Sequence, residues 1–385
     1  MKILILTSRF GMGHYCAAEA IKEELLAENS DDVIEIVDIV KVLLPISYKM
    51  IYRLFSLFIC RFSKVYNFVN SFATKHENTC VKGGKLKKIN SLIEKYNPDL
   101  IVSTWSASTR YISTYKEKYE DDIPLYTYIT DITAHDGWIT DMTDMYFVAT
   151  ESTKDMLLSK GVEDNKIVVN GIPVRKSFKQ DIELKSINDK KEILIMGGGL
   201  GLIPNLDNIL EKLYETSGVH ITIITGKNKK MLKELKSSYP KIEVIGYTDK
   251  VCRYMKRSDL IITKPGGIST FEAMYTSTPM YVIKPFLSQE VGNAEFIEKT
   301  GIGRIVWEND KDISKDIISL IRNEKLIEEM KSNMQLLRSE VSEFQLKKIY
   351  ERNVKRDVQF NTHKHYSSIF HDIWGHSYIA LQKVK

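Results

Sequence analysis

Short apolar runs rich in β-branched residues recur along the chain between segments with helical spacing. In the first half they occupy residues 2–6, 33–37, 100–103, 125–130 and 145–148, and in the second half residues 192–196, 220–225, 242–245, 260–263, 280–283 and 302–306. Such runs are typical of strands buried on both faces, and their alternation with helices indicates parallel βαβ units. The pattern therefore predicts an α/β protein with two doubly wound, Rossmann-like parallel sheets.

A polar stretch separates the two series of predicted strands. Residues 171–191 carry Pro173 and mixed charges and show no sustained period, so we place a linker there. An N-terminal domain at 1–170 and a C-terminal domain at 192–345 lie on either side of it.

Helical spacing follows the last predicted strand, at residues 313–322 and 325–348. The remaining tail, residues 346–385, has no interpretable period and carries His363, His365, His371 and His376. We favour a packed or flexible terminus over a metal site for this tail, whose role stays open.

The composition is that of an ordinary globular protein. The 385 residues are 43% hydrophobic and 27% charged, and a chain of this length usually builds more than one hydrophobic core. The 55 Lys and Arg against 50 Asp and Glu leave a net charge of +5, too weak a field to indicate nucleic-acid binding. We expect no nucleic-acid partner.

Cysteine usage and hydropathy indicate a cytoplasmic protein. Cys16, Cys60, Cys80 and Cys252 form no CxxC pair, so neither a zinc site nor a disulfide framework is expected. The first apolar run is too short for a signal peptide, and no uncharged stretch reaches the roughly 18 residues of a spanning helix. Any membrane contact is therefore expected to be peripheral, at the inner face of the cell membrane.

A glycine loop, Gly11-Met12-Gly13-His14, follows the first predicted strand and precedes a helical run. Ligands of open α/β sheets bind at the carboxyl ends of strands, where glycines let backbone approach closely. His14 at this position is either a general base or a structural histidine that bonds its own loop.

A second glycine run, at residues 197–201, follows the first strand of the second series. Further on, Lys264-Pro265-Gly266-Gly267 joins a strand to a helix that starts near Ser269 and Thr270. A helix N-terminus with hydroxyl neighbours favours a phosphate, so a diphosphate fits here. Glu272 in the first turn either accepts hydrogen bonds from a ribose diol or complements the helix dipole.

Another strand-to-helix turn carries Gln289, Glu290 and Asn293. Together these side chains offer the donors and acceptors that the hydroxyls of a sugar require. The alternative is a solvated polar loop.

Three motifs occur together in a fixed order: Gly11-Met12-Gly13-His14 with Ala17-Ala18, residues 130–135 (TDITAH) with Trp138-Ile139, and Lys264-Pro265-Gly266-Gly267 with Glu272-Ala273. In this combination the chain resembles lipid glycosyltransferases that include monogalactosyldiacylglycerol synthases and bacterial processive diacylglycerol glucosyltransferases. The peptidoglycan enzyme that adds N-acetylglucosamine to lipid I is similar more distantly. The resemblance covers roughly residues 1–310.

The resemblance implies a GT-B fold, with a lipid acceptor in the first domain, a UDP-sugar in the second and reaction in the cleft between them. His14 is implied as the base. The implied donor-binding positions are Gly13, Gly199 and Gly201 beside the donor and Gly246-Tyr247 near the uracil. Gly266, Gly267, Ser269 and Thr270 are expected at the diphosphate, Glu272 at the ribose, and Gln289, Glu290 and Asn293 at the sugar. The family often has Pro-Gly before the Gln-Glu pair, whereas Leu287 and Ser288 stand here, which leaves the sugar open.

The expected mechanism needs no cofactor and no metal. Amide donors from Gly267 to Thr270 stabilise the leaving diphosphate, and the anomeric carbon is inverted. Asp131 ends a strand of the first domain, and we expect it to hydrogen-bond the far nitrogen of His14 and fix its tautomer. The single D-x-D, Asp310-Lys311-Asp312, precedes a polar helix and is interpreted as its cap.

Residues 42–72 combine aromatic side chains at helical spacing with basic ones, among them Lys49, Tyr52, Arg53, Phe55 and Arg61. This pattern suits a helix lying at an anionic membrane surface. The alternative is a core helix with a basic outer face. His135 and Trp138 either contact the acceptor or pack their loop down.

The function predicted from the sequence is hexose transfer from a UDP-sugar to a lipid such as diacylglycerol. Two alternatives remain: a UDP-sugar 2-epimerase of the same architecture, and a nucleotide-sugar-binding protein without turnover. The oligomeric state is left open.

Overall fold

The computed structural model describes residues 1–61, 83–180, 190–201, 203–285, 288–307, 312–342 and 344–353. Contacts divide the chain into one unit at Met1–Ser342 and another at Glu343–Lys385. Both sheets belong to the first unit. In the second, residues 346–353 are helical.

The first lobe is built on a six-stranded sheet in the order β2-β1-β3-β4-β5-β6, with every neighbouring pair parallel. Its strands are β1 (Lys2–Thr7), β2 (Val33–Asp38), β3 (Leu100–Ser103), β4 (Leu125–Tyr128), β5 (Met145–Val148) and β6 (Ile167–Val169). Its helices are α1 (Gly13–Glu28), α2 (Ile39–Leu43), α3 (Tyr48–Arg61), α5 (Gly83–Tyr96), α6 (Ser106–Tyr119) and α7 (Glu151–Ser159), with short 3-10 turns η1 (Asp136–Trp138) and η2 (Asp164–Lys166).

The second lobe is built on a parallel six-stranded sheet in the order β12-β11-β10-β7-β8-β9. Its strands are β7 (Lys191–Met196), β8 (Val219–Ile224), β9 (Glu243–Ile245), β10 (Leu260–Thr263), β11 (Met280–Val282) and β12 (Gly303–Ile305). Its helices are α9 (Leu206–Leu213), α10 (Lys229–Ser238), α11 (Val251–Arg257), α12 (Gly267–Tyr275), α13 (Ser288–Lys299), α14 (Ile313–Arg322) and α15 (Glu324–Glu340), with the turn η3 (Gly198–Leu200).

The prediction of two doubly wound parallel sheets is confirmed, and each sheet has a point where the strand order reverses. In the first this point lies between β1 and β3, and in the second between β7 and β10. Ligands of open α/β sheets bind outside the carboxyl ends of strands at such a switch point. The loops after β1 and β10 are the glycine loops singled out in the sequence, so topology places both at binding positions.

Three details differ from the sequence prediction. The strand β6, at the edge of the first sheet, was not predicted, because a run of three residues carries little pattern. The predicted linker contains the short helix α8 (Lys176–Lys179), whose Phe178 is fully buried, and β7 begins at Lys191. The predicted helix at 325–348 stops at Glu340, because the backbone becomes extended at Val341.

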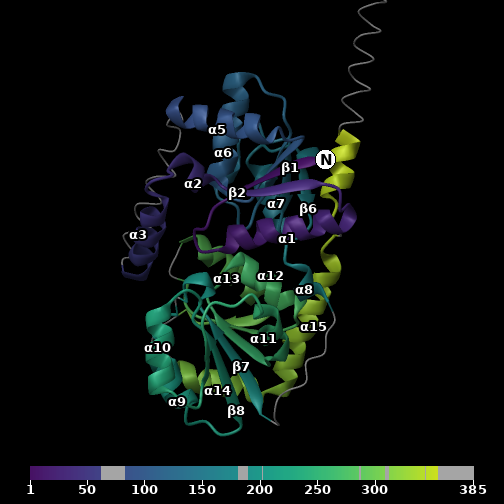
Figure 1. Ribbon diagram of the computed structural model, residues 1–385. Helices are drawn as coiled ribbons and strands as arrows, with labels where there is room; N and C mark the ends of the chain where they lie inside the picture. The colour runs from purple at the N-terminus through teal and green to yellow at the C-terminus, as the bar shows by residue number, and fades with distance from the viewer. Residues whose placement is uncertain are drawn as a thin grey trace, which may run out of the picture. The chain divides into compact units, whose positions relative to one another are not determined.

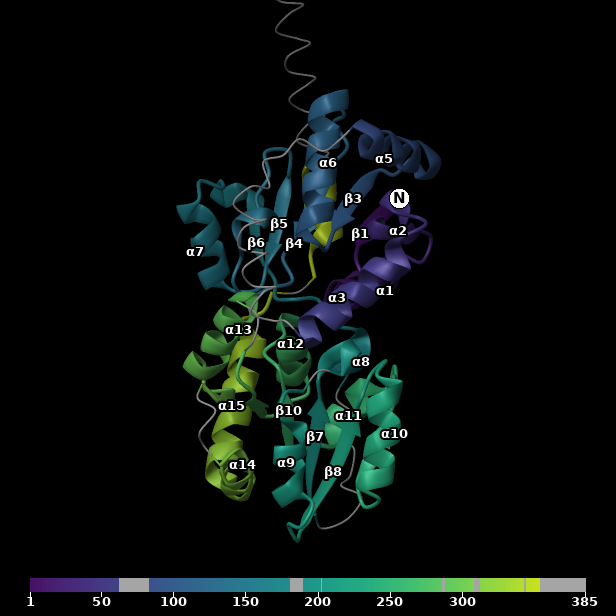
Figure 2. The ribbon, with the colours of Figure 1, turned by 90° about the vertical axis from the view of Figure 1, so that its left-hand side faces the viewer.

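The two lobes share part of their hydrophobic core. One cluster joins Ala17 and Ile132 of the first lobe to Ile268, Phe271 and Met274 on α12. The ribbon shows α1 lying against α12 at the junction of the lobes (Figure 1), and the rotated view places α13 farther from α1, on the other side of α12 (Figure 2). The lobes are therefore in direct packing contact around the site described next.

Candidate functional site

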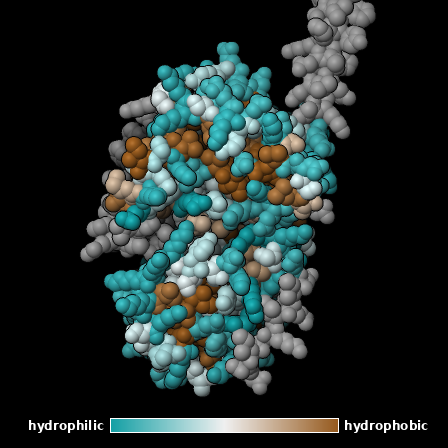
Figure 3. Space-filling view, viewed as in Figure 1, coloured by the Kyte–Doolittle hydropathy of each residue, from teal (hydrophilic) through white to brown (hydrophobic). Residues whose placement is uncertain are grey.

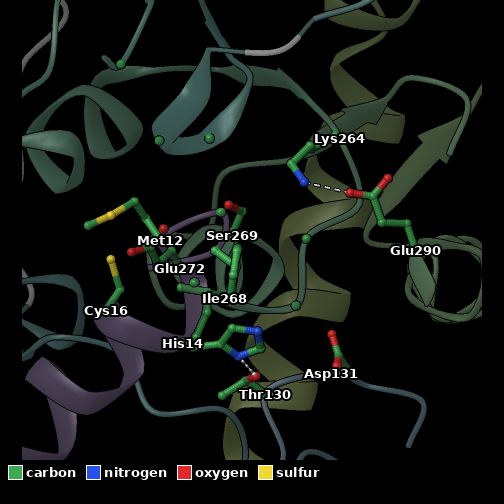
Figure 4. Close-up of a pocket in the computed structure, with 18 of the residues that line it drawn as sticks. Met12, His14, Cys16, Thr130, Asp131, Lys264, Ile268, Ser269, Glu272 and Glu290 are labelled. Carbon is green, nitrogen blue, oxygen red and sulfur yellow. Dashed lines mark hydrogen bonds and ion pairs between the residues drawn. The ribbon is translucent and has the colours of Figure 1, made fainter. Parts of the chain in front are cut away.

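A cavity of about 410 Å³ lies between the lobes. It is lined by the loops after β1, β3 and β4 on one side and by the loops after β7 and β10 on the other, together with the N-terminal turns of α1 and α12. Side chains from both lobes point into it (Figure 4). The predicted site residues His14, Gly13, Asp131, Gly199, Gly266, Gly267, Ser269, Glu272, Glu290, His135, Trp138, Tyr247, Phe55 and Asn293 all line this cavity.

His14 lies in the first turn of α1 and is held from two sides. Its Nδ1 is 2.8 Å from Oγ1 of Thr130, and its backbone carbonyl accepts a hydrogen bond of 2.9 Å from Oγ1 of Thr104. The other ring nitrogen faces the cavity (Figure 4). Burial lowers the pKa of His14 to about 4, and the backbone carbonyl of Thr104 opposes this only in part. The imidazole is therefore neutral near pH 7 and able to accept a proton.

The predicted hydrogen bond from Asp131 to His14 is wrong, because Thr130, one residue earlier, occupies the ring nitrogen. Asp131 faces the cavity beside His14 instead (Figure 4). Burial raises the pKa of Asp131 to about 6, and the carboxylate of Glu290 adds to this rise. Asp131 thus places a titratable carboxyl group in the cavity rather than behind the imidazole.

The N-terminus of α12 opens onto the cavity from the second lobe. Gly266 is its N-cap, and the first N–H groups of a helix have no partner within the helix. Ser269 lines the cavity, whereas Thr270 is fully buried and its hydroxyl donates to the Gly266 carbonyl at 2.9 Å. The prediction that the Thr270 hydroxyl faces the diphosphate is therefore corrected, because this hydroxyl already closes the first turn.

Glu272 lies one turn further along α12 and is 7% exposed. Burial raises its pKa to about 7, and the guanidinium of Arg175 counteracts this partly. Arg175 also lines the cavity. It was not predicted as a site residue, because it lies in the predicted linker, two positions after Pro173.

A buried ion pair lies on the opposite wall. Lys264 Nζ is 2.6 Å from Oε1 of Glu290, which is 4% exposed (Figure 4). The second oxygen, Oε2, has no hydrogen-bond partner within the described part of the chain. A buried acceptor without a partner is a candidate for a hydrogen bond from a ligand. Lys264 was not predicted as a site residue, although it opens the glycine motif; the side chain of Gln289 lies outside the described residues.

Asn293 was predicted to contact the donor sugar; it lines the cavity, and its amide is bonded to two backbone groups. Its Oδ1 accepts a hydrogen bond of 3.0 Å from the N–H of Ile132, and its Nδ2 donates at 3.0 Å to the carbonyl of Pro265. Asn293 is 2% exposed. The amide therefore links the two lobes at the edge of the cavity.

The predicted glycines divide into two groups. Gly13 and Gly199 line the cavity, and a Cβ at Gly199 would come within 2.6 Å of the Met12 side chain. Gly201 and Gly246 are not among the lining residues, and Gly201, at φ +66°, packs against the Thr225 carbonyl. The positive φ and close packing of Gly201 show that the local backbone requires glycine there, and a role of Gly201 and Gly246 in donor binding stays a prediction.

Trp138 and His135 hold the loop after β4. Trp138 is fully buried, with its ring 6.2 Å from that of His14 and 6.0 Å from that of His135. Nδ1 of His135 accepts a hydrogen bond from the N–H of Gly137 at 3.1 Å. Both side chains pack the loop down, which was one of the two predicted alternatives.

The inner face of α3 packs on the loop after β1 and on the end of β2. Tyr52 donates to Asp38 at 2.8 Å and accepts from the N–H of Arg9 at 3.0 Å, while Phe55 contacts Phe10 with ring centroids 4.6 Å apart. The prediction that Tyr52 and Phe55 face a membrane is therefore corrected.

The outer face of α3 carries a different set of side chains. Ile46, just before the helix, is 98% exposed, and Met50 and Leu54 are more than half exposed. The predicted basic residues Lys49 and Arg53 are exposed beside them, while the side chain of Arg61 and residues 62–72 lie outside the described part. Figure 3 shows apolar side chains gathered mainly over the half of the surface that holds the first sheet.

The described residues contain no group of three or more His, Cys, Asp or Glu side chains that could hold a metal ion. Asp312, the second carboxylate of the D-x-D, caps α14 by accepting a hydrogen bond from the N–H of Lys315, as predicted. The histidines of the tail lie outside the described residues. Within the described residues, no helix combines the length and the apolar character that crossing a bilayer requires.

Comparison with known proteins now identifies the family. A family model described as monogalactosyldiacylglycerol (MGDG) synthase matches residues 14–174, and one described as the glycosyltransferase family 28 C-terminal domain matches residues 193–352. The processive diacylglycerol beta-glucosyltransferase of Bacillus pumilus is 30% identical over 87% of this chain and 91% of its own length. The chain belongs to this glycosyltransferase family.

A second relative supports the same membership. The processive diacylglycerol beta-glucosyltransferase of Bacillus licheniformis is 30% identical over 91% of this chain and 95% of its own. The resemblance predicted from three motifs is thus confirmed over most of the chain. Because the family models and these relatives are glycosyltransferases, the 2-epimerase alternative is not favoured.

Solved structures confirm the fold. The Staphylococcus aureus MnaA–UDP complex superimposes with a TM-score of 0.61 at 17% identity, covering 94% of this chain and 97% of that one. Acinetobacter baumannii MurG gives a TM-score of 0.53 at 14% identity, over 87% and 95%. The two-lobed architecture is therefore the GT-B fold.

Proposed function

We propose that this protein transfers a hexose from a UDP-sugar to the hydroxyl of diacylglycerol, with inversion at the anomeric carbon. The observation that carries the proposal is the pairing across one cavity of a neutral imidazole, His14, and a helix N-terminus, that of α12. The relatives named diacylglycerol glucosyltransferases support the acceptor, and a HepE–UDP-glucose complex of the same fold, from Anabaena (TM-score 0.54, 13% identity), supports a donor of this kind.

In the proposed reaction the acceptor O–H bond breaks as the cavity-facing nitrogen of His14 takes the proton. The acceptor oxygen bonds to the anomeric carbon while the bond from that carbon to the diphosphate oxygen breaks on the opposite face. UDP leaves with the electron pair, and its growing charge is stabilised by the first N–H groups of α12, by Ser269 and by the nearby Lys264. No cofactor takes part in this scheme.

The remaining polar groups select the donor. Glu272 would accept hydrogen bonds from the ribose diol, because its carboxylate lines the cavity and is largely buried. Oε2 of Glu290 would accept a hydroxyl of the hexose, since it is buried and lacks a partner among the described residues. Its ion pair with Lys264 holds this carboxylate in a fixed orientation.

The acceptor would approach along the first lobe. The rings of Phe10, Phe55 and Trp105 form an apolar wall of the cavity, with Phe10 4.6 Å from Phe55 and 5.5 Å from Trp105 between centroids. Phe55 belongs to α3, and on the outer side of this helix Met50 and Leu54 are exposed beside Lys49 and Arg53. We propose that this outer face of α3 contacts an anionic membrane surface, at the cytoplasmic side, and brings the lipid to His14.

The activity test is a panel of UDP-sugars incubated with dioleoylglycerol in liposomes, with lipid products separated by thin-layer chromatography. One UDP-hexose should yield a glycolipid together with an equal amount of UDP. Binding of UDP without any lipid product across the panel would instead favour the nucleotide-sugar-binding alternative.

A sedimentation assay tests the membrane contact. With anionic liposomes, the double variant Met50→Ser/Leu54→Ser should bind at least about threefold more weakly, because it removes apolar area from the outer face. The matched control is Leu336→Ser, an exposed leucine on α15. Equal binding by all three proteins would contradict the role of α3.

A further inference from the structure

The loop after β4 touches the second lobe at successive positions. A Cβ on Gly267 would lie 2.4 Å from the carbonyl oxygen of Thr130, and a Cβ on Gly292 would lie 2.3 Å from the side chain of Thr133. Between these two contacts, the N–H of Ile132 donates to Asn293 at 3.0 Å. The contacts at Gly267 and Gly292 thus leave no space for a side chain, and the contact between them is a hydrogen bond to the buried side-chain amide of Asn293.

Asn293 joins two backbone segments that belong to different lobes. Its oxygen takes the Ile132 N–H, and its nitrogen donates to the carbonyl of Pro265 at 3.0 Å. The carbonyl of Ile132 is held in turn by Oγ1 of Thr153 at 2.5 Å, so the Ile132 peptide is fixed on both sides. One amide thereby ties the loop after β4 to the turn after β10.

Each of these segments carries a part of the proposed site. Thr130, two residues before Ile132, bonds the imidazole of His14 at 2.8 Å. Pro265 directly precedes Gly266 and Gly267, which open α12. One of the connections between the base and the diphosphate-binding turn therefore runs through the Asn293 amide, alongside the direct packing of Gly267 on Thr130.

We propose that Asn293 is a positioning residue that sets the separation between the His14 imidazole and the N-terminus of α12. It acts without touching the sugar, in the protein free of ligand as well as in the complex. The catalytic part of this statement rests on the proposed function, whereas the link between the lobes does not. A misplacement of about 1 Å between reacting groups can reduce a rate about 100-fold, so the expected effect falls on kcat.

The test compares Asn293→Ala with Asn333→Ala. Asn333 is a matched control, because its Nδ2 donates at 3.1 Å to the carbonyl of Gly301 within the second lobe, away from the cavity. Hydrogen exchange of the peptide at 128–135 is measured in ligand-free protein, together with UDP affinity and kcat, well below the melting temperature of each variant.

We expect Asn293→Ala to raise exchange at 128–135 at least about tenfold and to lower kcat by about 10- to 100-fold, with UDP affinity within about threefold. Asn333→Ala should change none of these. The result would differ if Asn293 bound the sugar directly. Asn293→Ala would then weaken UDP-sugar binding but not UDP binding, and hydrogen exchange at 128–135 would stay at the wild-type rate. That result would overturn the proposal.

A second pair of variants tests the same contact with Asn293 intact. Gly292→Ala should push Thr133 away and reproduce the faster exchange and lower kcat, and adding Thr133→Gly should restore both. A neutral Gly292→Ala would count against the proposal. If the wild-type protein transfers no sugar at all, the proposed function fails, while the exchange rates still decide the role of Asn293.

Discussion

The glycine loop after β1 and the glycine turn after β10 look alike in the sequence but use glycine for different reasons. Gly11 has φ +71° and nothing within 4 Å of a Cβ, so glycine is needed there for its backbone conformation. Gly267 has no such dihedral angle, but a Cβ would meet the Thr130 carbonyl at 2.4 Å, so it is needed for space. The loop after β1 therefore needs glycine for its own backbone conformation, whereas the turn after β10 needs it so that the first lobe can pack closely against it.

The two segments also differ in what they present to the cavity. The first ends in a side chain, His14, whose pKa is lowered to about 4 by burial. The second ends in backbone N–H groups whose partial charge is independent of pH. The proposed proton transfer therefore belongs to the first lobe and the proposed anion binding to the second. Substitutions in one lobe should affect one of these two properties more than the other.

The largest effect is expected at His14. His14→Ala removes the proposed base and should lower kcat by about 10²- to 10⁴-fold, with UDP affinity nearly unchanged because the groups of α12 are intact. His14→Gln is the control that keeps a hydrogen-bonding group near Thr130. Single-turnover rates and calorimetry of UDP binding give the two quantities; wild-type turnover in His14→Ala would reject the base.

Next in size is Gly267→Ala, which sharpens the comparison between the loops. Its Cβ has no room beside Thr130, so the lobes must separate, and both UDP affinity and kcat should fall by about 10- to 100-fold. The neighbouring Gly266→Ala is the control, because its Cβ would find only Ser269 Oγ at 3.8 Å. Equal behaviour of the two variants would show that close approach is unimportant.

A smaller effect is expected from pH. The pKa of Glu272 is raised to about 7 in the empty protein, and ribose hydroxyls that donate to its carboxylate would lower it on binding. UDP affinity should therefore be constant above about pH 7 and fall below it, by no more than tenfold per pH unit, with proton release on binding. Calorimetry in buffers of different ionisation enthalpy measures this, and Glu272→Gln should abolish it.

The smallest effect is expected at Gly11. Gly11→Ala forces a Cβ into a left-handed conformation and should cost about 1 to 2 kcal/mol of unfolding free energy, with kcat reduced less than about threefold. Asn tolerates this conformation better, so Gly11→Asn should be milder. Urea denaturation gives the comparison; equal stability of Gly11→Ala and the wild type would contradict the conformational role.

Much of the architecture could be predicted from local pattern. Buried parallel strands are continuous apolar runs, so most strands were placed within one or two residues, and only the short edge strand β6 was missed. The glycine motifs and His14 were visible because strand, glycine turn and helix follow one another directly along the chain.

The partners of the site residues could not be predicted in the same way. The imidazole of His14 is bonded by Thr130 and not by the adjacent Asp131. Which of these two neighbours reaches the ring depends on how the two loops are positioned relative to each other. Asn293 and Arg175 show the same limit, because the groups they act on lie far away in the sequence. Asn293 bonds Ile132, 161 positions earlier, and Arg175 lowers the pKa of Glu272, which lies in another segment of the chain.

The sequence by itself determined the two sheets, the family and the presence of an imidazole and a helix N-terminus at strand ends, because these follow from short-range periodicity and steric rules. Only the tertiary structure decided which groups face the cavity and which bond each other, turned Thr270 and Asn293 inward, and set the inner and outer faces of α3. Those outcomes depend on packing between segments distant in the chain, where shifts of an ångström or two decide whether a hydrogen bond forms.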